Sequence, residues 1–493
     1  MPQKSGEEVK QKSLKLNFLM NAVLTVSSFI FPLITFPYVS RILLPEGTGK
    51  VSFATSVVAY FALFAQLGIP TYGIRACAKV RDDAEELTRT VHEIFFINVV
   101  MTAITYVAFF AALEFVPRLR AERPLFLIVS TTLLFNAVGM DWLYKALEKY
   151  TYITLTSILF KFAALVAMFA LIHQKSDYVI YGGISILASS ASNLCNLLNV
   201  HRYIQFRPIG EYHFKRHLKP IFIFFAMSCA TTIYTNLDTV MLGFMKTDID
   251  VGYYNAAVKI KNVLLGVVTS LGTVLLPRAS YYIENGEIEQ FKRITKKAIE
   301  FVFLIAPSMA LYFILFAKEG VFFLSGDAYA PAVFPMQIIM PTLVFIGLTN
   351  IMGIQMLVPL GREKVVLYSE VAGAIVDLAL NAVLIPRMAA AGAAIGTLVA
   401  EMAVWCVQYA ALRKDVAEAY TSIKVYAILL ALVVGTGASL WVKLLNLGSF
   451  VTLVLSAMLF FGAYGMVLLV TKEPLICEIT AQAVSKLKGL VKK

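Results

Sequence analysis

Apolar blocks about twenty residues long, each followed by a short polar break, recur along the whole chain. A helix needs about twenty apolar residues to cross the hydrocarbon core of a bilayer. Only 15% of the 493 residues are charged, whereas soluble proteins carry about 25%. A transmembrane β-barrel would show alternating segments of about ten residues, and these blocks do not alternate. The sequence therefore predicts an all-α, polytopic membrane protein.

About fourteen transmembrane helices are predicted, and their ends are uncertain by a few residues. If the N-terminus lies inside, the inner segments hold about three times as many Lys and Arg residues as the outer loops. This bias predicts that both termini are cytoplasmic, and it explains most of the net charge of +12 without a nucleic-acid partner. The predicted spans are 17–40, 51–74, 92–114, 124–144, 152–172, 178–200, 219–243, 252–276, 298–317, 332–358, 365–385, 392–412, 424–442 and 449–470.

Cysteine and histidine residues give no sign of a metal site or a cofactor. The five cysteines have no CxxC or paired spacing, so we expect inert thiols. Three of the five histidines, His201, His213 and His217, lie in one predicted cytoplasmic loop, where we expect a solvated basic face. No loop carries a phosphate-binding glycine motif.

A weak internal repeat appears when the sequence is shifted by about 200 residues. GTGKVSFA at 47–54 then falls on DVGYYNAA at 250–257, which matches Gly49 with Gly252, and Arg75 falls on Arg278. A duplication of six helices gives two lobes in the same orientation, with a transport site between them near the midplane. The predicted segments are a cytoplasmic tail at 1–16, an N-lobe at 17–207, a C-lobe at 208–415, helices 13 and 14 at 416–472, and a basic amphipathic cytoplasmic tail at 473–493.

Four stretches in the two halves resemble a known family. They are ITFPYVSRILLPEGTGKVSFATSVVAYFALFAQLGIPTYGIRACAKV (34–80), DWLYKALEKYTYITLTSILFK (141–161), NLDTVMLG (236–243) and VGYYNAAVKI (251–260). Together they resemble the Wzx-type polysaccharide repeat-unit flippases, a polysaccharide transporter family of the superfamily that also contains the lipid II flippases and the multidrug (MATE) exporters. The chain departs from that pattern at Lys145 and Ala146, where the family usually has glutamine and glycine.

This resemblance implies two six-helix lobes around a central cavity that alternates between inward and outward openings. The cargo would be an oligosaccharide on a polyprenyl (undecaprenyl-type) pyrophosphate, moved from the inner to the outer leaflet of a bacterial cytoplasmic membrane. Surface polysaccharides such as O-antigen or capsule would be the product, with membrane lipids and polysaccharide assembly proteins as further partners. No catalysis is implied.

Cations inside the membrane are the candidate substrate-binding residues. Lys161 lies near the middle of the 152–172 span, where a charge is costly unless it faces a polar cavity. There it would attract the pyrophosphate, although backbone carbonyls or a carboxylate between packed helices could satisfy it instead. Arg41, Arg75 and Arg278 lie at predicted span ends and fit either a cavity rim or interfacial anchors.

Lys259 and Lys261 are two residues apart in one predicted helix and cannot share a face, so at most one of them lines a given cavity wall. Both are candidate substrate-binding residues. Asp238 is predicted at the same depth as Lys259 on the neighbouring antiparallel helix. An Asp238–Lys259 ion pair is therefore an alternative to any transport role.

Polar residues in the C-terminal half are the candidate ion-coupling residues. Helical spacing places Glu370, Asp377 and Asn381 on one face of the 365–385 span, and Thr397 and Glu401 on one face of the 392–412 span. The resemblance to lipid II flippases implies a sodium site formed by Asp238, Asp377, Asn381 and Thr397. The aspartate and asparagine stand in the opposite order here. A carboxylate could also carry a proton, so sodium and proton both remain candidates.

Two other classes compete with the flippase hypothesis. A cation-coupled MATE-class drug exporter usually has twelve helices and an acidic or aromatic cavity for cationic cargo, which the two extra helices and the intramembrane lysines disfavour. A membrane polymerase or ligase needs catalytic groups on a sizeable external loop, and the predicted external loops are short. The sequence thus favours a flippase.

Overall fold

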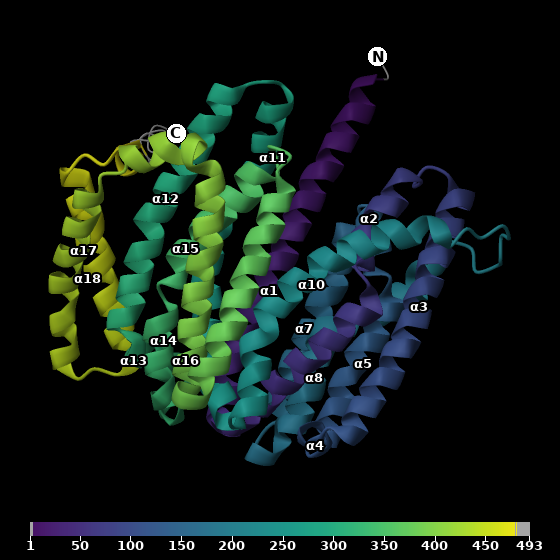
Figure 1. The fold of residues 1–493 in the computed structure, drawn as a ribbon, viewed down its shortest axis with the longest axis horizontal. Coiled ribbons are helices and arrows are strands. Elements are labelled where there is room, and N and C mark those ends of the chain that lie inside the picture. Colours follow the sequence, from purple (N-terminus) through teal and green to yellow (C-terminus); the bar gives the residue numbers. More distant parts are fainter. Residues whose placement is uncertain (1–2, 479, 481–493) are drawn as a thin grey trace. The chain divides into compact units, whose positions relative to one another are not determined.

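Every predicted span falls on helical structure in the computed structural model, which describes residues 3–478 and residue 480 (Figure 1). No β-strand occurs among these described residues. The chain divides into two compact units, Met1–Gly252 and Tyr253–Lys493. The predicted all-α architecture is confirmed. Most of the predicted amphipathic tail at 473–493 lies outside the described residues.

The first unit consists of ten α-helices, two short 3-10 turns and the first residues of α11. Their bounds are α1 (Gln3–Gln66), α2 (Ile69–Lys79), α3 (Ala84–Phe115), α4 (Pro117–Arg120), α5 (Arg123–Gly139), α6 (Asp141–Ala146), α7 (Tyr150–Leu171), η1 (Lys175–Asp177), α8 (Tyr178–Ser190), α9 (Ser192–Asn199), η2 (Val200–Arg202) and α10 (Lys215–Met245).

The second unit holds the rest of α11 and the helices that follow. A π-helix, η4, occurs between α15 and α16, and such turns are rare. The bounds are α11 (Asp248–Glu284), α12 (Ile288–Leu315), α13 (Ala317–Ser325), η3 (Asp327–Ala332), α14 (Val333–Ile339), α15 (Thr342–Thr349), η4 (Asn350–Leu357), α16 (Glu363–Ser422), α17 (Val425–Leu440), η5 (Trp441–Leu445) and α18 (Ser449–Val470).

Nine helices of the described chain are long and apolar enough to cross a membrane, or ten if one bent pair counts as a single span. This number is smaller than the fourteen predicted spans for three reasons. Helices α1 and α16 each contain two of the predicted spans, the 124–144 span falls on α5, which has only 17 residues, and the 178–200 span is divided between α8 and α9. In both α1 and α16 a single residue leaves helical geometry between the two spans: Leu44 (φ 58°, ψ 179°) in α1 and Ala389 (φ 48°, ψ −126°) in α16. Pro45 follows Leu44 and disfavours a helical conformation at the residue before it.

The two glycines that the repeat pairs lie at one close contact within the first unit. A Cβ atom at Gly49 would come within 1.8 Å of the Asp248 carbonyl oxygen, and a Cβ at Gly252 within 2.1 Å of the Pro45 carbonyl oxygen. The contact is reciprocal, since Pro45 precedes Gly49 by four residues just as Asp248 precedes Gly252. Backbones can approach this closely only where side chains are absent. The arrangement is what a local two-fold relation between repeated segments would produce.

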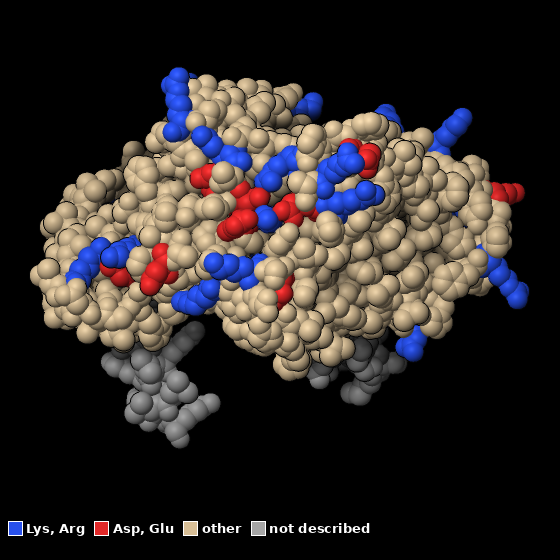
Figure 2. Space-filling model, turned by 90° about the horizontal axis from the view of Figure 1, so that it is seen from below, with Lys and Arg blue, Asp and Glu red and all other residues tan. Residues whose placement is uncertain are grey.

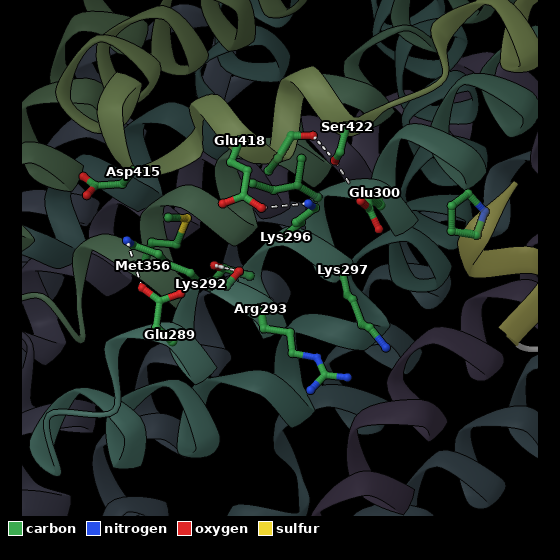
Figure 3. A pocket seen from close by; sticks show the side chains of 14 residues that line it. Glu289, Lys292, Arg293, Lys296, Lys297, Glu300, Met356, Asp415, Glu418 and Ser422 are labelled. Atoms are coloured by element: carbon green, nitrogen blue, oxygen red, sulfur yellow. Dashed lines mark hydrogen bonds and ion pairs between the residues drawn. The ribbon is translucent and has the colours of Figure 1, made fainter.

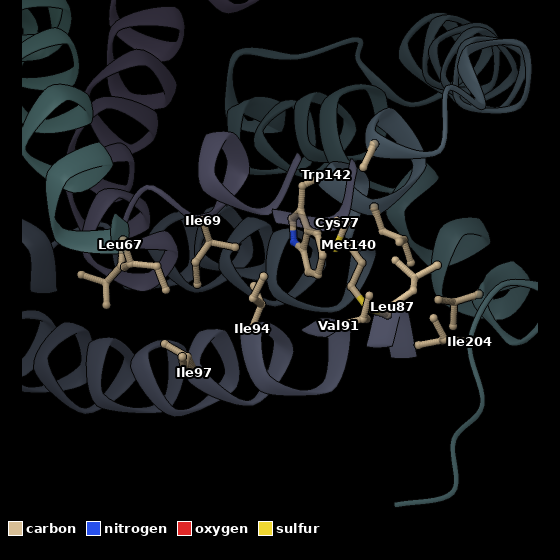
Figure 4. Close-up of a cluster of buried hydrophobic side chains, with 14 residues drawn as sticks. Leu67, Ile69, Cys77, Leu87, Val91, Ile94, Ile97, Met140, Trp142 and Ile204 are labelled. Atoms are coloured by element: carbon tan, nitrogen blue, oxygen red, sulfur yellow. The ribbon is translucent and has the colours of Figure 1, made fainter. Parts of the chain in front are cut away.

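A buried apolar cluster, which we call the α2–α3 core, fixes the part of the first unit that contains α2, α3 and α6 (Figure 4). The Trp142 ring lies against Gly73, where a Cβ would come within 2.7 Å of the indole. Ile221 brings the first turns of α10 into the same cluster. Its members are Leu67, Ile69, Cys77, Leu87, Val91, Ile94, Ile97, Met140, Trp142, Leu143, Ala146, Val200, Ile204 and Ile221.

In the second unit, α17 and α18 form an antiparallel pair that packs against α12 (Figure 1). Tyr312 of α12 donates its hydroxyl hydrogen to the Leu453 carbonyl (2.7 Å), and Tyr464 of α18 donates to the Leu304 carbonyl (2.7 Å). Many large apolar side chains on the other faces of this pair are exposed, for example Val433 and Met458. Such faces are typical of helices that contact lipid.

Charged side chains gather on the face that Figure 2 shows, where Lys and Arg lie beside Asp and Glu within a largely uncharged surface. In the first unit, Lys50 pairs with Glu122 at 2.9 Å, and Arg118 pairs with Asp248. Charges at the ends and few between them are expected of helices that cross a bilayer.

Candidate substrate groove

Lys161 lies at the middle of α7 and is half-buried, with its ammonium group turned toward α1. The Nζ atom donates hydrogen bonds to Ser27 Oγ (2.8 Å) and Ser28 Oγ (2.9 Å). Both serines donate their own hydroxyl hydrogens to the Leu24 carbonyl, so their oxygen lone pairs are left for the lysine. No carboxylate of the described chain lies within ion-pair distance of Lys161. Among the groups that the structure describes, its hydrogen-bond partners are these two neutral hydroxyl oxygens.

A groove of about 450 Å³ runs between α1 and α7 beside Lys161. Two hydrogen bonds join the helices on either side of it, from Thr154 Oγ1 to the Met20 carbonyl (3.0 Å) and from the Tyr38 hydroxyl to the Ile172 carbonyl (2.9 Å). The walls are otherwise apolar, and several of the side chains in them are exposed. The lining residues are Ala22, Val23, Val26, Ser27, Ile30, Phe31, Ile34, Ile158, Lys161, Phe162 and Leu165.

This groove can hold a ligand that is mostly hydrocarbon and has one anionic group. Apolar walls gain free energy by covering hydrocarbon, roughly 25 cal/mol per Å² of apolar surface removed from water. An ammonium without a counter-ion binds phosphate oxygens through charge-assisted hydrogen bonds. The combination suits a lipid phosphate better than it suits a cationic drug.

The other predicted cations occupy different environments. Arg41 donates from Nη1 to the Pro37 carbonyl one turn earlier in α1 (2.5 Å), so it satisfies a carbonyl close to the break at Leu44. Arg75 on α2 and Arg278 on α11 are exposed. Lys259 is half-buried and Lys261 buried on α11, and both have interactions with other groups. Their roles in substrate binding stay predictions.

Asp377 and Asn381 meet in the second unit as the helical spacing predicts. Asn381 Nδ2 donates to Asp377 Oδ1 at 3.1 Å, and both residues are almost fully buried. Gly396 from the second half of α16 closes over them, since a Cβ there would lie 2.3 Å from Asn381 Oδ1 and 3.0 Å from Asp377 Oδ1. The next residue, Thr397, shares a hydrogen bond of 2.9 Å with the hydroxyl of Tyr254.

The remaining candidates for ion coupling are less closely tied to that pair. Glu370 is half-buried and Glu401 is buried. Asp238 is buried on α10, in the first unit. No group of three or more His, Cys, Asp or Glu side chains in the described chain could hold a metal ion. A sodium site at Asp377 would thus depend on amide and hydroxyl oxygens together with carboxylates, which a hard cation accepts. The sodium site and the proposed Asp238–Lys259 pair both stay predictions.

A second pocket, of about 390 Å³, lies between the start of α12 and the end of α16 (Figure 3). Its charges largely neutralise one another: Lys296 contacts Glu418 at 2.9 Å, and Lys292 contacts Glu289 at 3.4 Å. Beside it, Lys297 pairs with Glu478 at 2.7 Å, and this hydrogen bond holds the pKa of the Glu478 carboxyl below its usual range. We interpret this pocket as a junction that ties the chain after α18 to α12.

One feature of the first unit was missed by the sequence analysis. Glu93 lies within the predicted 92–114 span and is fully buried, and it contacts Arg216 and His217 at the start of α10. His217 is almost fully buried, so the prediction that all three histidines form a solvated face is wrong for this residue. A carboxylate inside a predicted span was the available signal, because such a group requires a partner.

Comparisons with known proteins agree with this architecture. The model of the polysaccharide biosynthesis protein family matches residues 14–283, and the MatE model matches residues 224–383. A protein of Escherichia coli (strain K12) described as "Putative O-antigen transporter" is 28% identical over 391 residues, which cover 79% of this chain and 94% of that protein. A protein of Shigella dysenteriae with the same description is 26% identical over 376 residues, 74% of this chain and 91% of that protein.

Two solved structures share the fold. The lipid II flippase MurJ in an inward closed conformation superposes with a TM-score of 0.74 at 12% identity, over 93% of this chain and all of that chain. An inward-facing multidrug resistance MATE family transporter superposes with a TM-score of 0.63 at 14% identity, over 82% of this chain and 99% of that chain. These comparisons confirm the predicted fold of a multi-pass membrane protein, which is similar to the folds of MurJ and the MATE transporter. The similar proteins named above are described as transporters or flippases, and none as an enzyme.

Proposed function

Because the chain belongs to the polysaccharide biosynthesis protein family, we propose that it is a flippase for polyprenyl-pyrophosphate-linked oligosaccharides. It would carry the repeat units of a surface polysaccharide from the inner to the outer leaflet of the bacterial cytoplasmic membrane by alternating access. The descriptions of the Escherichia coli and Shigella dysenteriae relatives support the cargo class. The bias of Lys and Arg between inner and outer segments supports cytoplasmic termini.

One observation carries the proposal: the Lys161 ammonium, bound only to serine hydroxyls among the described groups, beside an apolar groove. A pyrophosphate would exchange part of its water shell for this ammonium, and the polyprenyl chain would cover the apolar walls of α1 and α7. We also propose that residues 17–207 and 208–415 form the two lobes of this transporter, and that entry of a cation is coupled to transfer of the cargo.

Lys161→Met tests this assignment because methionine keeps the length of the side chain and removes its charge. In liposomes that contain the protein, a fluorescent polyprenyl-pyrophosphate oligosaccharide is followed by its accessibility to an impermeant quencher. A hydrogen bond to a charged group contributes about 1.5–3 kcal/mol, so we expect transfer to fall about 10- to 100-fold. Lys161→Arg should retain part of the activity.

Lys175→Met, at an exposed position on η1 outside the groove, is the matched control and should transfer cargo at the wild-type rate. Wild-type transfer by Lys161→Met would remove Lys161 from the cargo path. If the wild-type protein moves no lipid-linked oligosaccharide but exports a cationic dye, the flippase proposal fails and the drug-exporter alternative, which the MatE match supports, takes its place.

A further inference from the structure

Glu93 of α3 is a fully buried carboxylate that gathers the start of α10 around itself. Its Oε1 atom accepts the backbone N–H of His213 at 2.5 Å. Its Oε2 atom accepts from Arg216, at 2.9 Å for Nε and 2.7 Å for Nη2, and lies 2.5 Å from His217 Nε2. On the other side of the imidazole, His217 Nδ1 lies 2.7 Å from the hydroxyl of Tyr72 on α2. We call these groups the Glu93 cluster.

The first turn of α10 needs this carboxylate. It contains Lys215, Arg216 and His217 and no acidic residue, and Phe214 provides no side-chain cap. Positive charge and unpaired N–H groups at a helix N-terminus are both unfavourable. Glu93, from another helix, supplies the missing negative charge and accepts a backbone N–H of the segment leading into the helix.

Because of Pro220, the first turn of α10 depends more on the hydrogen bonds of its side chains. Proline has no N–H, so the Arg216 carbonyl loses the helical hydrogen bond that residue 220 would otherwise donate. The α2–α3 core includes Ile221 but no residue of α10 before it. The polar attachment of the turn that precedes Pro220 to α2 and α3 includes Glu93, Tyr72 and Glu86, the last of which pairs with Arg216 at 2.7 Å, and Phe214 before the helix packs on the same core.

The imidazole of His217 can gain a proton without losing a hydrogen bond. Glu93 Oε2 also binds the Arg216 guanidinium and is ionised, so it only accepts; Nε2–H of a neutral His217 donates to it. Arg216 Nε lies 2.9 Å from Glu93 Oε2 and 3.3 Å from His217 Nε2. Its single hydrogen therefore goes to the carboxylate, which is the nearer acceptor. Nδ1 then accepts from the Tyr72 hydroxyl. A proton from water added at Nδ1 reverses that bond, with Nδ1–H donating to the tyrosine oxygen.

The carboxylates of Glu93 and Glu86 favour such a proton, whereas burial of the imidazole and the Arg216 guanidinium oppose it. Arg216 bridges Glu93 and Glu86, and Arg89 pairs with Glu85 and Glu86, so three carboxylates face two guanidinium groups. The α1 stretch 51–66 has no ionised side chain, and on α6 Asp141 and Lys145 pair with each other at 2.5 Å. The other charged or titratable groups on the elements around His217 include Arg75, Cys77 and Lys79 on α2, His92, Tyr106 and Glu114 on α3, Tyr144 on α6, Tyr212 and His213 before α10, and Lys215, Lys219, Cys229, Tyr234 and Asp238 on α10.

We propose that His217, between Tyr72 and Glu93, is a proton-binding site whose protonation tightens the attachment of the first turn of α10 to α2 and α3. Protonation gives the imidazole a positive charge opposite the ionised Glu93 carboxylate, so that both partners of this hydrogen bond are charged and attract each other directly. This inference concerns the binding of a proton and does not depend on the nature of the cargo. It adds a second titratable site to the one predicted at Asp377.

Histidine NMR tests the proposal directly on the full chain in detergent micelles. With isotope-labelled histidine, the five residues give separate ring signals, and the spectrum of His217→Gln identifies that of His217. We expect this signal to titrate reversibly as the imidazole gains and loses its proton. Glu93→Gln removes the opposite charge and should move the midpoint to lower pH by about 1–3 units.

His201, which is exposed and contacts only a nearby backbone carbonyl, provides the control signal, and its midpoint should be the same in both proteins. A His217 signal that stays constant while that of His201 titrates would overturn the proposal. A midpoint unchanged by Glu93→Gln would do so too. If Glu93→Gln fails to fold, Glu86→Gln provides the same test. It removes a negative charge near His217 but leaves the buried Glu93 in place, so it should lower the midpoint by a smaller amount.

The pH dependence of transfer provides a readout that a purely structural role would not change. Cargo transfer in liposomes is measured at equal pH on both sides, from about pH 5.5 to 8.5. The wild-type profile should contain an inflection at the NMR midpoint, and His217→Gln should lose this inflection while His201→Gln keeps it. An unchanged profile in His217→Gln would show that the proton does not influence transfer, and it leaves the flippase proposal itself unaffected.

Discussion

Lys161 and Glu93 are both charged side chains inside helical bundles, and the structure treats them in different ways. Glu93 is fully buried and is neutralised by Arg216, with His217 as a further partner. Lys161 is half-buried, and its partners among the described groups are two serine hydroxyls. A fully buried charge requires a counter-ion, whereas a charge at the edge of an open groove can rely on neutral oxygens and on its ligand.

Glycine at position 396 is required by the buried Asp377–Asn381 pair. In Gly396→Ala the new Cβ would lie 2.3 Å from Asn381 Oδ1, so the buried amide must move. Overpacking of this kind costs about 1–3 kcal/mol, which exceeds the gain of up to about 1 kcal/mol from replacing a helical glycine. We expect a lower midpoint of denaturant unfolding in detergent, followed by tryptophan fluorescence.

Gly437→Ala is the matched control for that substitution. Gly437 is also a helical glycine, on α17, and no atom lies within 4 Å of the position that its Cβ would take. We expect stability equal to the wild type or higher by up to about 1 kcal/mol. Equal midpoints for the two variants would contradict the close contact at Gly396.

At the scale of the helices, particular residues explain where a helix begins and where it breaks. The break at Leu44, before Pro45, lies between the predicted spans 17–40 and 51–74, and the break at Ala389 in α16 lies between the spans 365–385 and 392–412. The helix start at α3 has a different cause. Asp83 accepts hydrogen bonds from the backbone N–H groups of Glu85 (3.0 Å) and Glu86 (3.1 Å), which is the usual role of an N-cap residue.

Asp83→Ala should therefore weaken the start of α3. The loss of an N-cap side chain costs about 1 kcal/mol, within a range of about 0.5–2 kcal/mol. Because Glu86 and Glu93 both project from this helix, we also expect the His217 NMR signal to shift in this variant. Unfolding midpoints in detergent are the measurement, and Asp82→Ala, the exposed neighbour, should stay within about 0.5 kcal/mol of the wild type. Equal effects of the two substitutions would argue against the cap.

The chain divides into two compact units, and its fold is similar to that of MurJ. Transport coupled to an ion requires a group that changes its charge or its ligands when the ion binds. In the second unit, Asp377 is the buried carboxylate that contacts Asn381, beneath Gly396 of the following half-helix. We propose it as the coupling residue on that basis.

Asp377→Asn should uncouple cargo transfer from the cation gradient. A tenfold gradient of one coupled ion supplies about 1.4 kcal/mol and can shift the ratio of cargo between the leaflets about tenfold. With a sodium or a pH gradient across the liposome, the wild type should show this shift and Asp377→Asn should not. Glu363→Gln, at an exposed position at the start of α16, should respond as the wild type does. A gradient response retained by Asp377→Asn would exclude this carboxylate.

Much of this protein could be predicted from the sequence alone. The apolar blocks determine where helices lie, because a backbone in lipid must satisfy its hydrogen bonds within the segment. Spacing along a helix placed Asp377 and Asn381 on one face, where they now share a hydrogen bond. The repeat paired Gly49 with Gly252, and the structure shows that the two lie at one close backbone contact, which only glycine allows.

Only the tertiary structure decided which charges meet. Glu93 and His217 are more than a hundred residues apart, and the serines that bind Lys161 lie on a different helix, so no local pattern could identify either partnership. Helical periodicity fixes the direction in which a side chain points, but the identity of the neighbour depends on how helices pack. The free-energy cost of burying a charge therefore depends on which groups a neighbouring helix places within hydrogen-bonding distance.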